Sequence, residues 1–226
     1  MPNDQPRGPD GRWIKGKTVG AVLGAGLMAS LMAAAGGGDL TTSIGAGLDA
    51  ATSEASSAVD QSAVDKDTAD SQRDAKKGDD VDAWRRKGLK ELKKKVEHDL
   101  QCTVQSFGQV QQFFLQHPCD KLDQLLFVLG DTHDNLIVVS VMWVTMPSAE
   151  TASQFKKLED TYGTGDVTPF GTEALELGGI HFTGKHYKSR PDEKLVVVAE
   201  SEPVRGTPSN FFLKEVATIA DVLPPP

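Results

Sequence analysis

The side chains able to carry chemistry are few, because the 226 residues include only two cysteines and five histidines. Cys102 and Cys119 lie seventeen positions apart, at the two ends of a segment that we predict to fold as strand, turn and helix. Such a fold brings the two ends together, and a disulfide between them would stabilise the domain by about 3 kcal/mol. We therefore expect a Cys102–Cys119 disulfide, with two unrelated buried thiols as the alternative.

The histidines do not form a metal-binding pattern. His181 and His186 are five residues apart in a predicted strand, so their side chains point to opposite faces and cannot readily share a metal ion. His117 lies near Cys119, but the intervening Pro118 favours a helix end over a thiol–imidazole pair. Two cysteines are also too few for a four-thiolate zinc site. We predict no metal and no cofactor.

Two loops contain residue types that also occur in ligand sites. Asp131, Asp134 and Asn135 could hold a hard cation, but Asp and Asn are also the residues that tight turns prefer. The run Gly163-Thr164-Gly165-Asp166 lacks the lysine of a phosphate-binding loop and does not lead from a strand into a helix. No nucleophile-elbow or zincin motif occurs. The sequence thus favours a non-catalytic protein, with an enzyme whose site no motif reveals as the alternative.

A basic amphipathic helix is predicted over residues 82–100, which read DAWRRKGLKELKKKVEHDL. Trp84, Leu92, Val96 and Leu100 recur in it at helical spacing. Seven cations occupy the rest of its surface: Arg85, Arg86, Lys87, Lys90, Lys93, Lys94 and Lys95. They are a candidate anion-binding face for a lipid headgroup, an acidic polymer or nucleic acid. The alternative is a solvated face on a helix whose apolar stripe docks on the domain.

Charge is distributed in blocks along the chain. The net charge is +2 over residues 1–38, −7 over residues 39–83, +4 over residues 84–101 and −7 over residues 102–226, which accounts for the total of −8. This acidic total argues against a nucleic-acid-binding protein, which is normally strongly basic. Blocks of such different character indicate a modular chain rather than one globule.

An apolar segment lies near the N-terminus. Residues 18–35, TVGAVLGAGLMASLMAAA, carry no charge and follow a basic tail over residues 1–17, which we expect to be cytoplasmic. A basic flank before an apolar run is typical of an export signal. Ala33-Ala34-Ala35 suits signal-peptide cleavage, whereas the length of the run also suits a retained transmembrane segment. We assign residues 18–38 to a signal or transmembrane segment, with a buried Gly/Ala-rich helix of a soluble protein as the third alternative.

The next segment, residues 39–81, is rich in Ala, Ser, Thr, Asp and Gly and contains no aromatic residue. It has too few large apolar side chains to offset the entropy of ordering, so we predict an acidic low-complexity linker. We accordingly expect residues 82–226 to fold without it.

Residues 101–226 have the patterns of an α+β domain. Two hairpins are predicted, from Leu122–Leu129 with Leu136–Met146 across GDTHDN and from Ile180–Lys188 with Leu195–Glu202 across SRPDE. Three helices are predicted, over residues 106–117, 148–163 and 208–223. Ser106 and Ser148 are the expected N-caps of the first two. With a short strand at Cys102–Gln105, the order is β-α-β-β-α-β-β-α. This order predicts an antiparallel sheet with helices mainly on one face, in a ferredoxin-like arrangement.

Four runs in this domain are similar to a family of uncharacterised actinobacterial proteins: SFGQVQQFFLQHPCDKLDQLLF, LIVVSVMWV, GTGDVTPF and FTGKHYKSR with VVVAESEP. The resemblance covers roughly residues 82–223. Those proteins share an N-terminal apolar segment, a low-complexity stretch and this domain. The resemblance implies an exported or membrane-anchored protein and carries no assigned activity.

Together these features predict a non-catalytic, envelope-facing interaction or sensor module. We expect it to be secreted, or anchored in the membrane through residues 18–35, with its C-terminal domain outside the cytoplasm. An unknown protein or an envelope polymer is the expected partner. The alternatives are an enzyme with an unrecognised site on the sheet and, with less support, a polyanion or nucleic-acid binder through residues 85–95.

Overall fold

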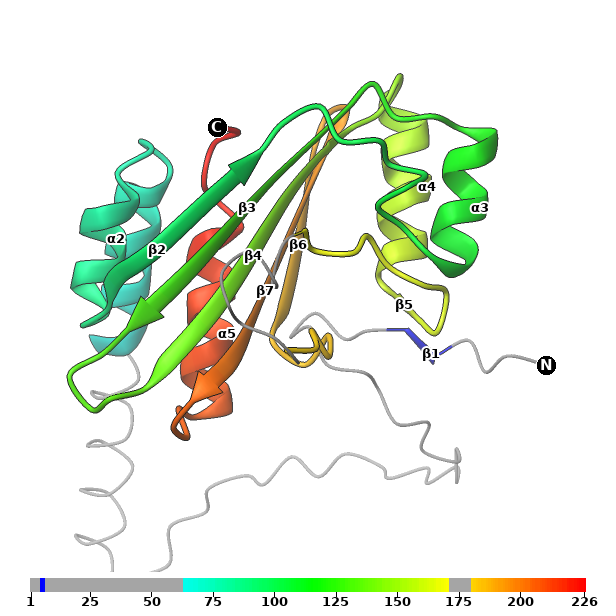
Figure 1. The fold of residues 1–226 in the computed structure, drawn as a ribbon. Coiled ribbons are helices and arrows are strands. Elements are labelled where there is room, and N and C mark those ends of the chain that lie inside the picture. Colours follow the sequence, from blue (N-terminus) through cyan, green and yellow to red (C-terminus); the bar gives the residue numbers. More distant parts are fainter. Residues whose placement is uncertain (1–4, 7–62, 171–179) are drawn as a thin grey trace, which may run out of the picture. The chain divides into compact units, whose positions relative to one another are not determined.

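The computed structural model describes residues 5–6, 63–170 and 180–226, which form an α+β fold built on a five-stranded antiparallel sheet (Figure 1). The predicted signal or transmembrane segment, residues 18–38, lies outside this part of the chain, as do residues 39–62 of the predicted linker. Within the described residues, no helix is both long and apolar enough to cross a membrane.

The strands of the main sheet lie in the order β2-β3-β4-β7-β6, and every neighbouring pair is antiparallel. Their bounds are β2 Lys90–Glu97, β3 Lys121–Gly130, β4 Leu136–Thr145, β6 Tyr187–Asp192 and β7 Leu195–Arg205. A separate two-residue pairing joins β1 (Gln5–Pro6) to β5 (Thr161–Tyr162). In a ferredoxin-like sheet, another strand lies between the first two strands of the chain. Here β2 pairs directly with β3, so the strand order differs from the predicted ferredoxin-like arrangement.

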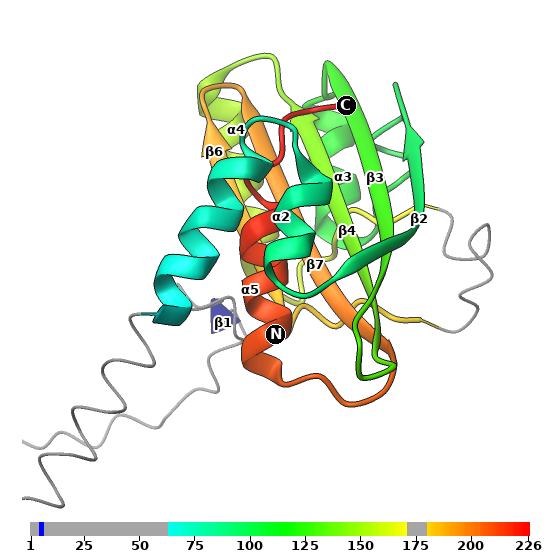
Figure 2. The same ribbon diagram turned by 90° about the vertical axis from the view of Figure 1, so that its left-hand side faces the viewer.

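Helices cover both faces of the sheet, whereas the sequence predicted them mainly on one (Figure 1, Figure 2). α2 (Asp80–Arg86) and α5 (Asn210–Ala220) cover what we call the first face. α3 (Gly108–Gln116) and α4 (Ala149–Glu159) cover the second face. Nearly every residue of β3 and β4 is buried, so both sides of these strands require a cover.

The first face holds a continuous apolar core around two fully buried tryptophans. Trp84 of α2 meets the ring of Phe127 edge-on, with 5.5 Å between the ring centroids. Trp143 of β4 packs in the same core and donates its indole N–H to the backbone oxygen of Leu223 at 3.1 Å. Burial of each such side chain contributes about 1.5–3 kcal/mol, so this face supplies much of the stability of the fold.

The second face combines apolar clusters with buried polar side chains. Phe114 of α3 and Phe155 of α4 are in contact, with ring centroids 5.0 Å apart, over one end of the face. A second apolar cluster lies toward the other end, and Gln124 of β3 is buried between the two. The Gln124 amide donates to the backbone oxygen of Thr168 at 3.1 Å and accepts from the backbone N–H of Phe170 at 2.7 Å. It therefore fixes residues 168–170 over the sheet.

The predicted basic helix over residues 82–100 is wrong in its second half. α2 ends at Arg86, and the residues from Lys90 to Glu97 form β2, the edge strand paired with β3. Gly88 has a left-handed backbone (φ 69°), which suits the change from helix to strand. Pairing with β2 satisfies backbone groups along one edge of β3 that a helix would leave without partners.

Residues 63–75 are helical, so the predicted linker over residues 39–81 ends earlier than expected. Ser71 and Ala75 of this helix are fully buried, Ala75 in the core of the first face. A protein truncated to begin at residue 82 would lose this packing. Part of the buried core therefore lies before residue 82, and folding of residues 82–226 on their own stays a prediction.

A buried lysine joins this helix to the rest of the domain. The side chain of Lys87, only 6% exposed, has its ammonium 3.0 Å from the carboxylate of Asp67 and 3.1 Å from that of Glu215 in α5. Gln72 donates a side-chain hydrogen bond to the backbone oxygen of Thr218 at 3.0 Å. These contacts link residues 67–75, α2 and α5 into one layer.

The predicted hairpin over residues 122–146 is confirmed, because β3 and β4 pair without interruption along their whole length. The expected N-cap of α4 is also confirmed. The Ser148 hydroxyl accepts from the backbone N–H of Thr151 at 3.1 Å, and the Thr151 hydroxyl accepts from the backbone N–H of Ser148 at 3.2 Å. This reciprocal pair fixes the start of the helix.

Three local expectations are wrong. Cys102–Gln105 forms a turn rather than a strand. α3 begins at Gly108, so Ser106 does not cap it; the Ser106 hydroxyl donates instead to the backbone oxygen of Cys102 at 2.7 Å. The second predicted hairpin is shifted along the chain: residues 180–186 of the predicted strand Ile180–Lys188 are not a strand, and β6 instead begins at Tyr187 and runs through most of the predicted SRPDE turn to Asp192. The reversal falls at Glu193, whose backbone is left-handed (φ 52°).

Candidate functional site

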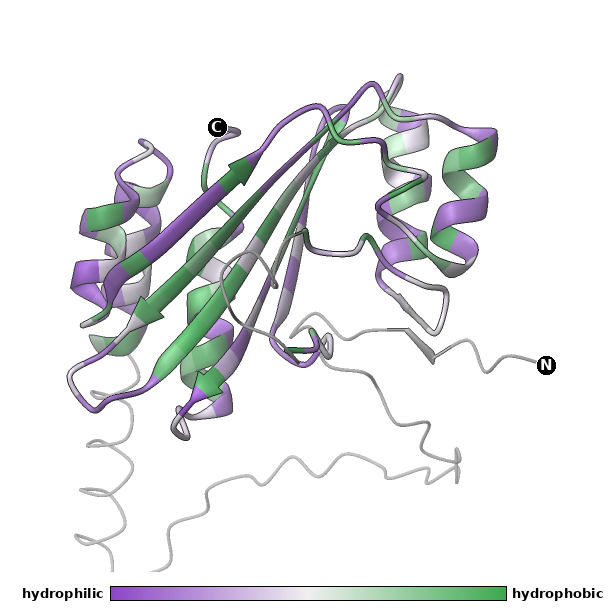
Figure 3. Cartoon of the chain, in the orientation of Figure 1, coloured by the Kyte–Doolittle hydropathy of each residue, from purple (hydrophilic) through white to green (hydrophobic). Residues whose placement is uncertain are grey.

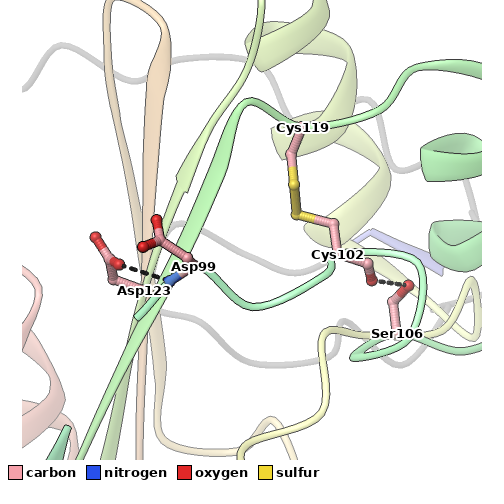
Figure 4. Close-up of a disulfide and its surroundings, with 5 residues drawn as sticks. All are labelled: Asp99, Cys102, Ser106, Cys119 and Asp123. Atoms are coloured by element: carbon pink, nitrogen blue, oxygen red, sulfur yellow. Dashed lines mark hydrogen bonds between the residues drawn. A yellow bond between two sulfur atoms is a disulfide. The ribbon is translucent and has the colours of Figure 1, made fainter. Parts of the chain in front are cut away.

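Cys102 and Cys119 form the expected disulfide, with their Cα atoms 6.3 Å apart (Figure 4). The bond closes residues 102–119, called the lobe below, at the point where the chain enters β3. Both cysteines of the sequence are used, so the protein has no thiol available as a nucleophile or metal ligand while the bond is intact.

A second loop holds the lobe against the domain. The backbone N–H of Phe107 donates to the oxygen of Asp166 at 3.1 Å, just before α3 begins. Gly165 makes this approach possible because its backbone is left-handed (φ 108°), and a Cβ there would lie only 2.1 Å from the backbone oxygen of Phe107. Gly165 of the run GTGD thus serves chain packing, whereas Gly163 faces open space and has a left-handed backbone (φ 83°).

The inner side of the lobe is part of the core. Val110 and Phe114 of α3 are fully buried, and Phe113 stacks on Phe155 of α4 at 6.3 Å between centroids. The disulfide packs in the same cluster, since Cys102 is 3% exposed. α3 is therefore held rigidly, by a covalent bond at one end and by aromatic packing along its length.

The outer side of the lobe exposes apolar side chains. Phe107 is 55% exposed and Leu115 is 66% exposed, and both lie on one side of α3 with Gln111 between them. Gln111 donates its amide to the backbone oxygen of Thr103 at 2.9 Å, which brings the turn containing Val104, 67% exposed, beside them. Hydrophobic stretches are visible on α3, the helix farthest from α2 and α5 (Figure 3).

The lobe contains no Asp, Glu, Lys or Arg, although these make up 25% of the sequence. Its polar side chains are mainly amides: Gln105, Gln109, Gln111, Gln112 and Gln116. From the sequence this segment was predicted to contain a helix and a disulfide, but not a binding surface. Eighteen consecutive residues without charge, closed by a cysteine at each end, were the signal that could have found it.

A cleft of about 330 Å³ lies at the base of the lobe, beside the disulfide. The residues that line it are Asp99, Leu100, Gln101, Cys102, Thr103, Pro118, Cys119, Asp120 and Lys121. Their side chains are polar, except for the disulfide, Leu100 and Pro118. Asp99 adopts a left-handed backbone (φ 52°) and its N–H donates to the buried carboxylate of Asp123 at 3.3 Å (Figure 4).

The cleft is lined by three charged residues, Asp99, Asp120 and Lys121. Lys121 lies 2.7 Å from the carboxylate of Asp123, and this hydrogen bond raises the pKa of the lysine. A lysine that acts as a nucleophile or base needs a lowered pKa, so Lys121 here is a fixed cation.

The seven predicted anion-binding residues do not share one surface. In α2, Arg85 lies 2.6 Å from Asp82, and Arg86 is paired with Asp74. Lys87 is buried between two carboxylates, as described above. Each of these three cations therefore has an acidic partner in the chain.

The four lysines of β2 are divided between the two faces of the sheet. Lys94 pairs with Asp80 and lies over the Phe127 ring on the first face. Lys95 lies over the ring of Phe170 on the second face, and its ammonium is 3.1 Å from the carboxylate of Glu97. Lys90 and Lys93 are exposed. The prediction of a single anion-binding face depended on helical spacing, and residues 90–97 form a strand instead. Anion binding by individual residues stays a prediction.

The acidic loop between β3 and β4 forms a turn. The Asp131 carboxylate accepts from the backbone N–H groups of His133, at 2.8 Å, and Asn135, at 2.9 Å, and from the Asn135 amide at 2.7 Å. Asp134 has the left-handed backbone (φ 63°) that such turns require. Among residues 63–170 and 180–226, no group of three or more His, Cys, Asp or Glu side chains is arranged to hold a metal.

One histidine lies beside the cleft: His98 Nδ1 is 3.3 Å from the Asp123 carboxylate that also holds Lys121. His181 is exposed, and His117 lies against the ring of Phe113, with 4.9 Å between the ring centroids. His186 is 4% exposed, and its Nε2 lies 2.9 Å from the side-chain oxygen of Asn210. Its Nδ1 lies 3.5 Å from the carboxylate of Glu202.

Acceptors thus face both ring nitrogens of His186. Burial opposes its charge, but the hydrogen bonds with Glu202 and Asn210 outweigh burial and raise its pKa. The pKa of Glu202 is lowered, because hydrogen bonds from His186 and Thr183 outweigh the opposing effect of burial. This pair ties β7 to the start of β6 and to α5 and is structural.

Comparison with known proteins adds nothing to this description. No protein-family model matches the chain, and neither a curated protein nor a solved structure is detectably similar to it. The functional interpretation therefore depends on the lobe and the cleft themselves.

Proposed function

We propose that this chain is a non-catalytic interaction module of the cell envelope and that the outer side of the lobe is its binding surface. The observation that carries the proposal is a surface segment of eighteen residues without a charged side chain that exposes Val104, Phe107 and Leu115. The buried centres of protein interfaces are depleted in charge and enriched in large apolar side chains in the same way.

The attachment of the lobe supports this role. A binding surface that is ordered before it meets its partner avoids the entropy cost of ordering on binding. The disulfide, the packing of α3 on α4 and the contact with Asp166 supply this preorganisation. The adjoining cleft, with Asp99, Asp120 and Lys121, supplies polar groups at the rim.

The proposed location is outside the cytoplasm. Disulfides persist in oxidising compartments, and the apolar run over residues 18–35 after a basic tail is typical of an export signal. In this proposal residues 18–38 are the signal or anchor and residues 39–62 are a spacer to the domain.

A reporter fused to the C-terminus tests the location. A reporter that is active only in the cytoplasm should be silent on the exported chain. An active reporter, together with soluble protein that still begins at Met1, would contradict export.

Site-specific cross-linking in intact cells tests the binding surface. A photo-cross-linking amino acid in place of Gln112, exposed on α3 beside Leu115, should give a covalent adduct that Phe107→Glu removes. The same amino acid in place of Lys194, exposed in the β6–β7 turn, is the matched control and should give none. Absence of an adduct from position 112, or an equal adduct from both positions, would overturn the proposed function.

A further inference from the structure

We propose that the cleft at the base of the lobe binds a small amino acid with two amino groups, such as lysine or ornithine. This site is separate from the outer side of the lobe, so the inference goes beyond the proposed function and does not depend on it. It follows from the size of the cleft, from the charges that line it and from the way in which the chain holds them.

The size of the cleft suits a small molecule. Its volume of about 330 Å³ lies at the lower end of the range for small-molecule sites, about 300–1,000 Å³. Part of its wall is apolar and is formed by Leu100, Pro118 and the Cys102–Cys119 disulfide (Figure 4). Such a wall can contact the hydrocarbon part of a ligand whose ends are charged.

Both signs of charge line the cleft. Asp99 and Asp120 contribute carboxylates, and among the described residues neither has a cation at ion-pair distance. Lys121 contributes an ammonium, so the lining carries two negative charges and one positive charge. A diamino acid at neutral pH carries the opposite set, with two ammonium groups and one carboxylate. The charges of the cleft and of this ligand class are therefore complementary.

A buried carboxylate holds the cation of the cleft. Asp123 is 2% exposed, and its carboxylate lies 2.7 Å from the Lys121 ammonium and 3.3 Å from Nδ1 of His98. The Lys121 side chain is still 43% exposed, and an ammonium has three N–H donors. Donors therefore remain for the carboxylate of a ligand. The hydrogen bond with Asp123 also raises the pKa of Lys121, which keeps the ammonium charged at neutral pH.

The backbone on both sides of the cleft is fixed. The N–H of Asp99 donates to the Asp123 carboxylate at 3.3 Å, and the N–H of Asp120 donates to the backbone oxygen of Thr145 at 2.8 Å. The disulfide joins the segment that follows Asp99 to the segment that precedes Asp120. The two carboxylates are thus carried by ordered backbone before a ligand arrives, which reduces the entropy cost of binding.

The exposure of the charged groups sets the expected strength. Asp99 and Asp120 are both exposed, so water and salt screen their charges. We therefore expect a dissociation constant of about 1 mM for a free diamino acid.

Titration of the full-length protein with L-lysine, followed by NMR chemical shifts, tests the proposal. We expect saturable shifts of the backbone amides in residues 99–103 and 119–121. Cadaverine lacks the carboxylate of lysine, and L-norleucine lacks its second amino group. Each should bind about tenfold more weakly, because one charge-assisted contact is lost. Equal affinity for lysine and either analogue, or no saturable shift with lysine, would overturn the proposal and leave the cross-linking test of the lobe unaffected.

Two variants place the ligand in the cleft. Asp99→Asn and Asp120→Asn should each weaken lysine binding about tenfold. Asparagine also tolerates the left-handed backbone of position 99 (φ 52°), so the turn is kept. Lys121 is left intact, because its removal would take a cation from buried Asp123.

Asp134→Asn is the matched control. It removes one negative charge from another left-handed position (φ 63°), beyond the other end of β3, and should leave lysine affinity unchanged. Equal weakening in all three variants would show a general attraction to an acidic protein and would overturn the site. The amide spectrum of each variant without ligand confirms that a lost affinity does not reflect unfolding.

Discussion

The two faces of the sheet differ in what holds their covers in place. On the first face, residues 63–75, α2 and α5 cover a continuous apolar core, and the ion pairs of Lys87 lie at the contacts between these helices. On the second face, the apolar clusters are separated by buried Gln124, and the cover is held by aromatic packing of α3 on α4, by a disulfide and by loop contacts. Both faces thus bury apolar side chains, and the second also carries a disulfide-closed surface made from a short helix.

Substitution of Trp84 by Ala should test the first face with the largest effect. Trp84 is fully buried against Phe127, so its removal leaves a large cavity, and we expect a loss of about 3–5 kcal/mol in the free energy of unfolding. Urea unfolding followed by circular dichroism measures this loss. Phe107→Ala, at the exposed N-cap of α3, is the control and should change stability by less than about 0.5 kcal/mol. Equal losses for the two variants would show that the lobe is buried in the folded protein.

The second face should be weakened most by removing the disulfide. Cys102→Ser together with Cys119→Ser releases the ends of the lobe in the unfolded chain, and we expect a loss of about 3 kcal/mol. Reduction of the wild-type protein should produce a similar shift of the urea midpoint and none in the double variant. Hydrogen exchange should then rise in residues 102–119 more than in α5. Uniform exchange over both faces would contradict the assignment of the disulfide to one of them.

The elements that the sequence predicted well carry their signal locally. β3 and β4 are long apolar runs separated by a turn whose Asp and Asn residues fix it, so the hairpin can be read without knowing the rest of the fold. Ser148 caps α4 through its side-chain oxygen, as predicted, and α5 lies within the predicted range 208–223, with Ser209 as its N-cap. The disulfide was predictable because the two cysteines bracket one helical segment.

The elements that the sequence missed depend on distant partners. β2 is rich in lysine and its apolar residues recur at helical spacing, but it is a strand because the edge of β3 needs a partner. Lys94 and Lys95 lie on aromatic rings of opposite faces, a contact no local pattern reveals. The helix over residues 63–75 packs through Ser71 and Ala75, which are too small to give a hydrophobic signal. The binding surface of the lobe also depends on a distant partner, because packing of α3 on α4 decides which apolar side chains of α3 are buried and which are exposed.

Asp221, a buried carboxyl at the end of α5, should destabilise the folded protein at neutral pH, so its replacement should increase the free energy of unfolding. Burial raises the pKa of Asp221 to about 6, although the charge of Arg190 opposes the shift. Because the folded state then binds this proton more tightly than the unfolded state, stability falls as the pH rises from about 4 to about 6 and is constant above that. Asp221→Asn should therefore stabilise the protein at pH 8 by up to about 3 kcal/mol, since each pKa unit corresponds to about 1.4 kcal/mol. The gain should vanish near pH 3.5.

The urea midpoints of the wild type and Asp221→Asn at pH 3.5 and pH 8 measure this difference. Asp192→Asn is the control, because the Asp192 side chain is 61% exposed in β6 and should change neither midpoint by more than about 0.5 kcal/mol. A gain that is equal at both pH values would show that the asparagine acts through packing and not through the buried charge.

His186→Gln should have the smallest effect, because it removes a charge-assisted contact at the end of the sheet and leaves both cores intact. The raised pKa of His186 means that its contribution is complete below pH 6.5 and is lost as the pH rises through the folded-state pKa. The lowered pKa of Glu202 means that its contribution is complete above pH 4.5 and is lost as the pH falls through its own folded-state pKa. The difference between the wild type and His186→Gln should therefore be largest between pH 4.5 and pH 6.5, at about 1–2 kcal/mol, and smaller at pH 8.5. Thermal melts across this range measure it, with His181→Gln at an exposed position as the control. A difference that does not change with pH would mean that the imidazole of His186 is neutral and contributes through packing alone, like the apolar side chains on the two faces.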